Sequence, residues 1–342
     1  MSLKNLSVKT KIPKTLINKL NHKKITQIYR NFEKNLSIDD KFIVAVSGGP
    51  DSLALAFLAK IYSIKKKLTA KFLIIDHKIR KESTKEALKV KKTLKKNSIN
   101  AKILTWKGKK PTSNVQSIAR NERYRLLFQK SKKLKVNNIL LGHHQDDLFE
   151  NFFIRILRGS GLKGLISLKK KTKIENKILL RPLLNFKKED LIFISKKVFN
   201  FYITDPSNEN DKYLRVKVRK MINELQKNGL DKKKFNKTID NLKKSNEVIS
   251  FYVNENLSNN SFFSKKHNRL ILNKTFFLQP YEVIFRSLTE LLRFVGKKYY
   301  PVRGKKLENI IKDIENNRFS KATLGGCIIE NVNQTVLISK ER

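Results

Sequence analysis

The stretch VAVSGGPDSLALAFLA, residues 44–59, places a glycine-rich polar turn between two apolar segments. Residues 42–46 (FIVAV) are typical of a buried strand, and residues 53–59 (LALAFLA) favour a helix. The turn therefore joins the end of a strand to the start of a helix. Adjacent glycines let the backbone curl closely around a ligand, and a helix start offers unpaired N–H groups and the positive end of its dipole.

Phosphate is the ligand that such a turn favours. The candidate phosphate-binding residues are Ser47, Gly48, Gly49, Pro50, Asp51 and Ser52. The turn fits neither GxxxxGK(S/T) nor GxGxxG, because no lysine follows its glycines. An ordinary kinase-type NTPase is therefore disfavoured. The alternative is a glycine turn that only precedes a core helix, and the flanking serines and aspartate argue against it.

Strand-like and helix-like segments alternate through roughly the first two hundred residues, which predicts an α/β domain with a largely parallel sheet. Further strands are predicted at residues 71–76, 101–106 and 137–142. Helices are predicted at residues 83–97 and 113–134, with Ser83 and Ser113 as N-caps and Glu86 completing a capping box.

Polar clusters follow three of the predicted strands, at residues 47–52, 76–80 and 143–147. Ligands of parallel sheets collect at the carboxyl ends of the strands. We therefore expect the three clusters to converge on one edge of the sheet.

The segment GHHQDDLFEN, residues 142–151, is the richest in titratable side chains. Asp147 and Glu150 are spaced i, i+3, so they share a face of a helix that begins near Asp146. The two carboxylates could bind Mg²⁺ or hold an ammonium group; alternatively they only favour the helix N-terminus. His143 and His144 lack the HExxH spacing of a zinc site, and one of them could orient a carboxylate or carry protons.

The pattern changes after about residue 222. Residues 228–257 predict a basic, partly amphipathic helix, and residues 258–268 a loop or linker. Helices at 280–296 and 302–317, followed by a closing β-hairpin around residues 331–333, complete a smaller domain. We therefore expect two domains, residues 1–222 (core about 38–222) and residues 223–342.

The chain carries 76 Lys plus Arg against 29 Asp plus Glu, a formal net charge of +47 over 342 residues. Even after allowance for a compositional bias toward Lys, Asn and Ile, this excess favours a polyanionic partner. A single cysteine, Cys327, excludes an intrachain disulfide and any site built only from cysteines. No signal-peptide core or 18-residue apolar run occurs, so the sequence predicts a soluble, cytoplasmic protein without a membrane partner.

Several motifs together resemble the tRNA(Ile)-lysidine synthetases, which belong to the PP-loop ATP pyrophosphatases. They are SGGPDS at 47–52, DHKIR at 76–80, IARNERY at 118–124, GHHQDDLFEN at 142–151, RGSGLKGL at 158–165 and TDPSNENDKYLRVKVRK at 204–220. SGGxDS alone marks the superfamily, and HHxDD, RGSG and DPSN in that order narrow it to this family. The resemblance runs from about residue 38 to 222 and, weakly, over 323–329. The chain departs from the family pattern at Asp76, where asparagine is frequent, and at Gln116, where glutamate is common.

This resemblance implies a PP-loop domain of the adenine nucleotide alpha hydrolase type, then a helical linker and a small α+β C-terminal domain that binds tRNA. It implies a ligase that attaches free L-lysine to C2 of the wobble cytidine, position 34, in the CAU anticodon of tRNA(Ile). The cytidine is first adenylated with loss of pyrophosphate, and the lysine amine then displaces AMP. ATP is the co-substrate and Mg²⁺ the expected metal ion.

Residue chemistry offers candidates for these steps. Asp51 is the candidate metal ligand beside the leaving pyrophosphate. It forms the expected catalytic set together with His143 and Asp147. The attacking amine must lose a proton, and His143, Asp147 or Glu150 could accept it.

The substrate-binding candidates are Asp147 and Glu150 for the lysine ammonium group, and Arg120 or Arg123 for its carboxylate or the ATP phosphates. RNA phosphates could be contacted by Tyr213, Arg215, Lys217 and Arg219. DPSN and RGSG are also strong turn sequences, so both could be purely structural.

Three alternatives stay open. A PP-loop tRNA thiolase activates a base in the same way, but such enzymes commonly need paired cysteines, and this chain has one cysteine. A non-catalytic RNA-binding protein is a second alternative, which the intact SGGPDS and HHQDD segments disfavour. A small-molecule amidotransferase or synthetase of the same superfamily is the third, but it would not require a net charge of +47. The sequence leaves the oligomeric state open, with a homodimer as one option.

Overall fold

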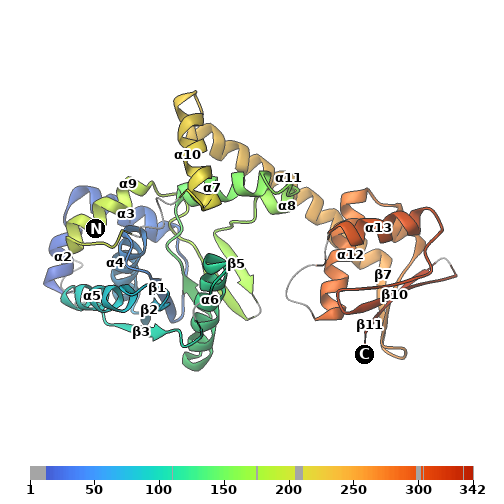
Figure 1. Cartoon of the computed structure of the whole chain (residues 1–342), viewed down its shortest axis with the longest axis horizontal. Coiled ribbons are helices and arrows are strands. Elements are labelled where there is room, and N and C mark those ends of the chain that lie inside the picture. Colours follow the sequence, from blue (N-terminus) through green and yellow to red (C-terminus); the bar gives the residue numbers. More distant parts are fainter. Residues whose placement is uncertain are drawn as a thin grey trace. The chain divides into compact units, whose positions relative to one another are not determined.

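A computed structural model describes the chain over residues 13–109, 111–174, 176–204, 211–297, 302, 304–333 and 335–341. The chain divides into two compact units, one ending at Leu230 and the other beginning at Asp231, and each unit has its own hydrophobic core (Figure 1). Within these ranges, no helix is long and apolar enough to cross a membrane.

A six-stranded sheet forms the centre of the first unit, in the order β3-β2-β1-β4-β6-β5. The strands are β1 (Phe42–Val46), β2 (Ala70–Asp76), β3 (Ala101–Thr105), β4 (Asn138–Leu140), β5 (Lys171–Ile174) and β6 (Lys177–Leu180). All neighbouring pairs are parallel except β5 and β6, which form an antiparallel hairpin at the edge. The predicted α/β domain with a largely parallel sheet is confirmed; the short, lysine-rich edge hairpin was not predicted.

Helices cover both faces of this sheet (Figure 1). They are α2 (Lys14–Leu20), α3 (Lys23–Lys34), α4 (Pro50–Lys65), α5 (Ser83–Lys96), α6 (Val115–Leu134), α7 (Gln145–Ile156), α8 (Leu162–Leu165), α9 (Lys188–Phe199) and α10 (Leu214–Lys227). The core on one face includes residues of α3, α4, α5 and α9, whereas Leu127 of α6 packs with Ile43 and Leu73 on the other. Every residue from Leu53 to Ala59 is fully buried, which explains why this part of α4 is apolar all round.

The predicted capping of α5 and α6 is wrong. The Ser83 hydroxyl donates a hydrogen bond to the carboxylate of Asp76 (2.8 Å), and Glu86 pairs with Arg80 (2.8 Å), so neither side chain caps α5. Helix α6 begins after Asn114, which adopts a left-handed conformation with φ 50°, instead of after Ser113. Ser83 is drawn away from the helix end because the carboxylate of Asp76 is buried and needs hydrogen-bond donors.

The carboxyl ends of β1, β2 and β4 lie at one edge of the sheet because the three strands are parallel. The convergence of the polar clusters that follow these strands is therefore confirmed. The chain connects β1 outward to β2 and β3 on one side, whereas β4 and β6 lie on the other side. The loops after β1 and β4 therefore flank the topological switch point, where open α/β sheets bind ligands.

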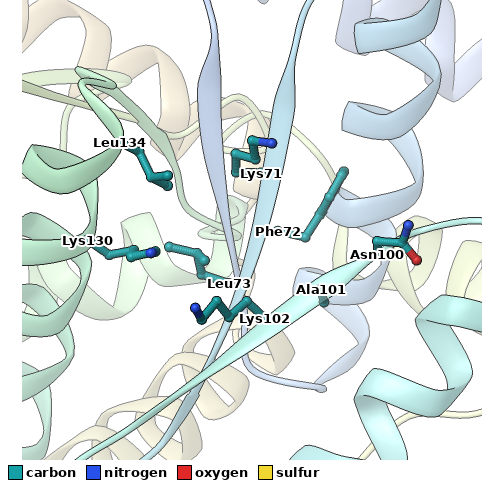
Figure 2. A pocket seen from close by; sticks show the side chains of 8 residues that line it. All are labelled: Lys71, Phe72, Leu73, Asn100, Ala101, Lys102, Lys130 and Leu134. Atoms are coloured by element: carbon teal, nitrogen blue, oxygen red, sulfur yellow. The ribbon is translucent and has the colours of Figure 1, made fainter.

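A cavity of about 300 Å³ lies where β2 and β3 begin, at the opposite ends of these strands from the polar clusters. Figure 2 shows Lys102 and Lys130 reaching toward each other beside Leu73, with Lys71 nearby. This basic cavity is thus separate from the edge at which the sequence motifs gather.

The second unit is an antiparallel sheet with helices. The strands are ordered β7 (Ser261–Ser264), β8 (Arg269–Leu272), β11 (Thr335–Lys340), β10 (Cys327–Val332) and β9 (Lys321–Leu324). The helices are α11 (Lys232–Asn260), α12 (Tyr281–Gly296) and α13 (Gly304–Glu315), with a 3₁₀ turn at Lys274–Leu278.

The helices predicted in this second unit and its closing hairpin are confirmed. The predicted loop at 258–268 is wrong, because Ser261–Ser264 pairs with Arg269–Leu272. Gly325 and Gly326, with φ 68° and 78°, make the turn between β9 and β10.

Candidate active site

The loop between β1 and α4 is closed by its own serine. Ser52 Oγ accepts hydrogen bonds from the N–H groups of Ser47 (3.1 Å) and Gly48 (3.0 Å) and donates one to the carbonyl of Gly49 (3.0 Å). Gly49 is the N-cap of α4, and Pro50 stands at the first helical position, where its missing N–H costs nothing. The loop is therefore rigid, and it presents the N-terminus of a buried helix.

Helix α9 and the segment after it hold this loop from behind. The Ser195 hydroxyl donates to the carbonyl of Pro50 (2.6 Å), and the N–H of Ile203 donates to the carbonyl of Gly48 (2.9 Å). Gly48 has φ +90°, a conformation that L side chains rarely adopt.

Asp51 lies in the first turn of α4 with its side chain 25% exposed. Its Oδ2 atom is 3.7 Å from Nε2 of His144, and its Oδ1 atom is buried without a hydrogen-bond partner among the residues that the structure describes. Burial raises the pKa of Asp51; the neighbouring Asp147 adds to this, while His144 and Lys188 act in the opposite sense.

His144 caps helix α7. Its side-chain Nδ1 atom accepts a hydrogen bond from the main-chain N–H of Asp146 (3.2 Å). The main-chain N–H of His144 donates to Oδ2 of Asp147 (2.9 Å). The Nε2 atom then lies between two carboxylates, 3.7 Å from Oδ2 of Asp51 and 3.6 Å from Oδ2 of Asp147. Of the two candidate histidines, His144 is the one that lies between the carboxylates.

Asp147 and Glu150 share one face of α7, as their spacing predicts, and that face meets two arginines of α10. Arg215 contacts Oδ1 of Asp147 (3.1 Å) and Oε2 of Glu150 (2.5 Å), and Arg219 contacts Oε1 of Glu150 (2.8 Å). Glu150 is 3% exposed, so these contacts compensate a buried charge. Burial would raise the pKa of Asp147, but His144, His143 and Arg215 outweigh it, and the pKa is lowered.

Three basic residues of this site were not predicted from the sequence. Arg215 and Arg219 were expected to contact RNA, but they bind the acids of α7; their i, i+4 spacing places both on one helix face, as the i, i+3 spacing does for the two acids, and this was the available signal. The third is Lys188, whose charge lowers the pKa of Asp51. A lysine at the first position of a helix opposes the helix dipole, which is a sign that it serves another purpose.

Of the remaining candidates, His143 and Arg120 belong to the surroundings of Asp147, whereas Arg123 lies near His77. Burial lowers the pKa of His143 to about 3, with nearby arginines, Arg120 among them, adding to the effect. Arg120 also donates a hydrogen bond to the hydroxyl of Tyr124 (3.2 Å). Arg123 acts on a different histidine, His77, whose pKa burial lowers to about 4. The DPSN motif at 205–208 lies outside the described residues.

Comparison with known proteins agrees with this geometry. Residues 18–226 match the PP-loop domain. The U34-tRNA thiolase NcsA of Methanococcus maripaludis, solved with its 4Fe-4S cluster, has a similar fold, with a TM-score of 0.55 and 21% identity over 66% of this chain and 81% of that chain. The fold and its loop thus define a PP-loop protein, a class that uses ATP.

Proteins with similar sequences identify the family within this class. The tRNA(Ile)-lysidine synthase of Orientia tsutsugamushi is 36% identical over 327 residues, which cover 91% of this chain and 71% of the relative. That of a Wolbachia of Brugia malayi is 30% identical over 89% of this chain and 71% of the relative. The tRNA(Ile)-lysidine synthase of Rhodopseudomonas palustris is 35% identical over 191 residues, which cover 55% of this chain and 55% of the relative. The chain belongs to the tRNA(Ile)-lysidine synthase family.

The loop conformation predicts a marked difference between two neighbouring glycines. A Cβ atom on Gly48 would lie 2.6 Å from Cγ2 of Val90 and 2.8 Å from Cδ1 of Ile203, whereas on Gly49 the nearest atom would be 3.9 Å away. Gly48→Ala should lower the free energy of unfolding by about 1–3 kcal/mol, while Gly49→Ala, which only exchanges a fair N-cap residue for a poor one, should lower it by less than about 1 kcal/mol. Denaturant unfolding of both variants measures this, and equal stabilities would contradict the loop geometry.

The depressed pKa of His143 predicts a pH dependence of stability. The unfolded chain binds this proton below about pH 6.5 and the folded chain only below about pH 3, so the free energy of unfolding should fall as the pH is lowered between these values. His143→Asn should reduce that slope by about one proton. The exposed His267 provides the control, since His267→Asn should leave the slope unchanged. Equal slopes for wild type and His143→Asn would show that this histidine titrates normally.

Proposed function

We propose that this protein joins the ε-amine of free L-lysine to C2 of the wobble cytidine in the CAU anticodon of tRNA(Ile). One observation carries the proposal: Asp51 of the PP-loop lies 3.7 Å from His144, whose helix presents the acids Asp147 and Glu150. A site for ATP and a site for a cation thus adjoin at one sheet edge. Membership of the tRNA(Ile)-lysidine synthase family supports the identity of the substrates.

In the first step, the C2 oxygen of cytidine attacks the α-phosphorus of ATP, and the bond to pyrophosphate breaks. The loop Ser47–Ser52 and the first turn of α4 supply N–H donors and a positive dipole end for the phosphates. Lys188, close enough to influence Asp51, adds a positive charge as the leaving group becomes more negative.

Asp51 is the residue that fits a magnesium ion, because its buried Oδ1 atom has no hydrogen-bond partner in the described part of the chain. Mg²⁺ commonly uses one or two carboxylates together with substrate phosphates, and Asp51 would supply one of them. A bound Mg²⁺ would neutralise charge on the phosphates.

In the second step, the lysine nitrogen attacks C2, the bond from C2 to the oxygen of AMP breaks, and the amine loses a proton. Asp147 and Glu150 hold the ammonium end of lysine, while Arg215 and Arg219 keep both carboxylates in place. Arg120 lies near enough to His143 to bind the carboxylate of lysine or a phosphate. His143, Asp147 or Glu150 accepts the proton in this proposal; His143 has a buried Nδ1 atom without a hydrogen-bond partner among the described residues.

The second structural unit belongs to the proposed tRNA-binding C-terminal domain, residues 223–342. Support comes from the net charge of +47, which suits a partner with many phosphates. Because tRNA, ATP and free lysine meet in the cytoplasm, we propose that the protein acts there.

Mass spectrometry of tRNA tests the proposed function. Purified protein, ATP, Mg²⁺ and isotopically labelled lysine should add one labelled lysine, with loss of water, to the wobble cytidine of a tRNA(Ile) transcript with a CAU anticodon. A transcript with uridine at that position should stay unmodified. Asp51→Asn should abolish the product, because it removes the proposed metal ligand, whereas the exposed Asp39→Asn should not.

Two other outcomes of the same experiment would reject the proposal. Incorporation of sulfur when a sulfur donor is supplied would identify a thiolase. Tight tRNA binding with neither pyrophosphate release nor any mass change would identify a non-catalytic RNA-binding protein.

A further inference from the structure

We propose that His144 is a positioning residue: through Nε2 it holds the carboxylate of Asp51 and the carboxylate of Asp147 in the arrangement that the two reaction steps share. This inference rests on the proposed function. It gives His144 a role distinct from that of its neighbour His143, which is a candidate for proton transfer.

His144 is held at one end of its ring and faces two carboxylates with the other. The side chain is 7% exposed, and Nδ1 accepts a hydrogen bond from the main-chain N–H of Asp146 (3.2 Å). An imidazole nitrogen that accepts carries no proton, so Nε2 is the nitrogen that carries one. The Nε2 atom lies 3.7 Å from Oδ2 of Asp51 and 3.6 Å from Oδ2 of Asp147, within ion-pair distance of both.

The two carboxylates come from opposite sides of the switch point. Asp51 follows β1, whereas Asp147 is carried by the helix that follows β4, and these strands are neighbours in the sheet. Without a positive or donor group between them, two close carboxylates repel each other. His144 lies within 4 Å of a carboxylate oxygen of each.

The two carboxylate oxygens of Asp51 have different surroundings. Oδ2 faces His144, while Oδ1 is buried and has no hydrogen-bond partner among the described residues. Orientation by His144 thus leaves one oxygen for the proposed metal ion. Loss of this contact should let the Asp51 carboxylate rotate, which would disturb pyrophosphate departure, and should also loosen Asp147 on the lysine side.

Two substitutions separate this role from helix capping. Asn places a side-chain oxygen near the position of Nδ1 and is a good N-cap, but it has no atom near Nε2. Gln places an amide N–H near the position of Nε2 but is a poor N-cap. His144→Asn should therefore keep the stability of the cap and lose the contact with the carboxylates, and His144→Gln should do the reverse.

The experiment compares thermal unfolding with single-turnover rates of pyrophosphate release and of lysine transfer to tRNA(Ile). His144→Asn should unfold close to the wild-type temperature. It should lower the single-turnover rate constants of both steps by about 10²-fold, and the tRNA concentration that gives half the maximal rate should stay unchanged. His144→Gln should unfold at a lower temperature than His144→Asn but react at least about tenfold faster.

Activity that follows stability, with Asn equal to or better than Gln, would overturn the inference and leave His144 as a helix cap only. Wild-type rates in both variants would overturn it as well. Failure of the proposed function is recognised separately, since then the wild-type protein itself transfers no lysine, and the inference falls with it.

Discussion

The burial of helix α4 is the constraint on which the rest of the structure depends. Leu53 to Ala59 are fully buried beneath the parallel sheet, so the helix cannot shift without exposing a large apolar surface. Its N-terminus is thereby fixed where β1 ends, beside the switch point of the sheet. Ser52, Ser195 and Ile203 then hold the short loop before it. A rigid, anion-attracting loop is thus a direct consequence of core packing.

Burying carboxylates beside this loop costs desolvation free energy, and the surrounding positive charges offset that cost. Glu150 is almost fully buried, and a buried carboxylate is costly unless it is paired. Arg215 bridges Glu150 and Asp147, and Arg219 adds a second guanidinium to Glu150. Helix α10 therefore acts as the support of the acidic face of α7. This arrangement leaves the proposed lysine subsite with two acids whose positions are already set before substrate arrives.

Local patterns in the sequence were enough to predict the elements that carry this site. The apolar run before Ser47 and the small apolar residues after Ser52 identify the strand and helix, and the i, i+3 spacing identifies the shared face of Asp147 and Glu150. The pairing of Glu150 with Arg215, 65 residues further along the chain, was not predicted, because contacts at that separation leave no local periodicity. The Ser83 cap failed for a local reason, because its hydroxyl donates to the buried carboxylate of Asp76.

The central claim is that one sheet edge both activates cytidine with ATP and delivers lysine to it, in two separable steps. The most direct measurement is a reaction of protein, ATP and tRNA(Ile) without lysine, to which lysine is added afterwards. Mass spectrometry gives the mass of the tRNA before and after lysine is added. The account predicts an adenylated tRNA formed together with pyrophosphate, which lysine then converts to the lysine adduct with release of AMP. If no adenylated tRNA forms before lysine is added, or if lysine fails to discharge it, the two-step account is contradicted.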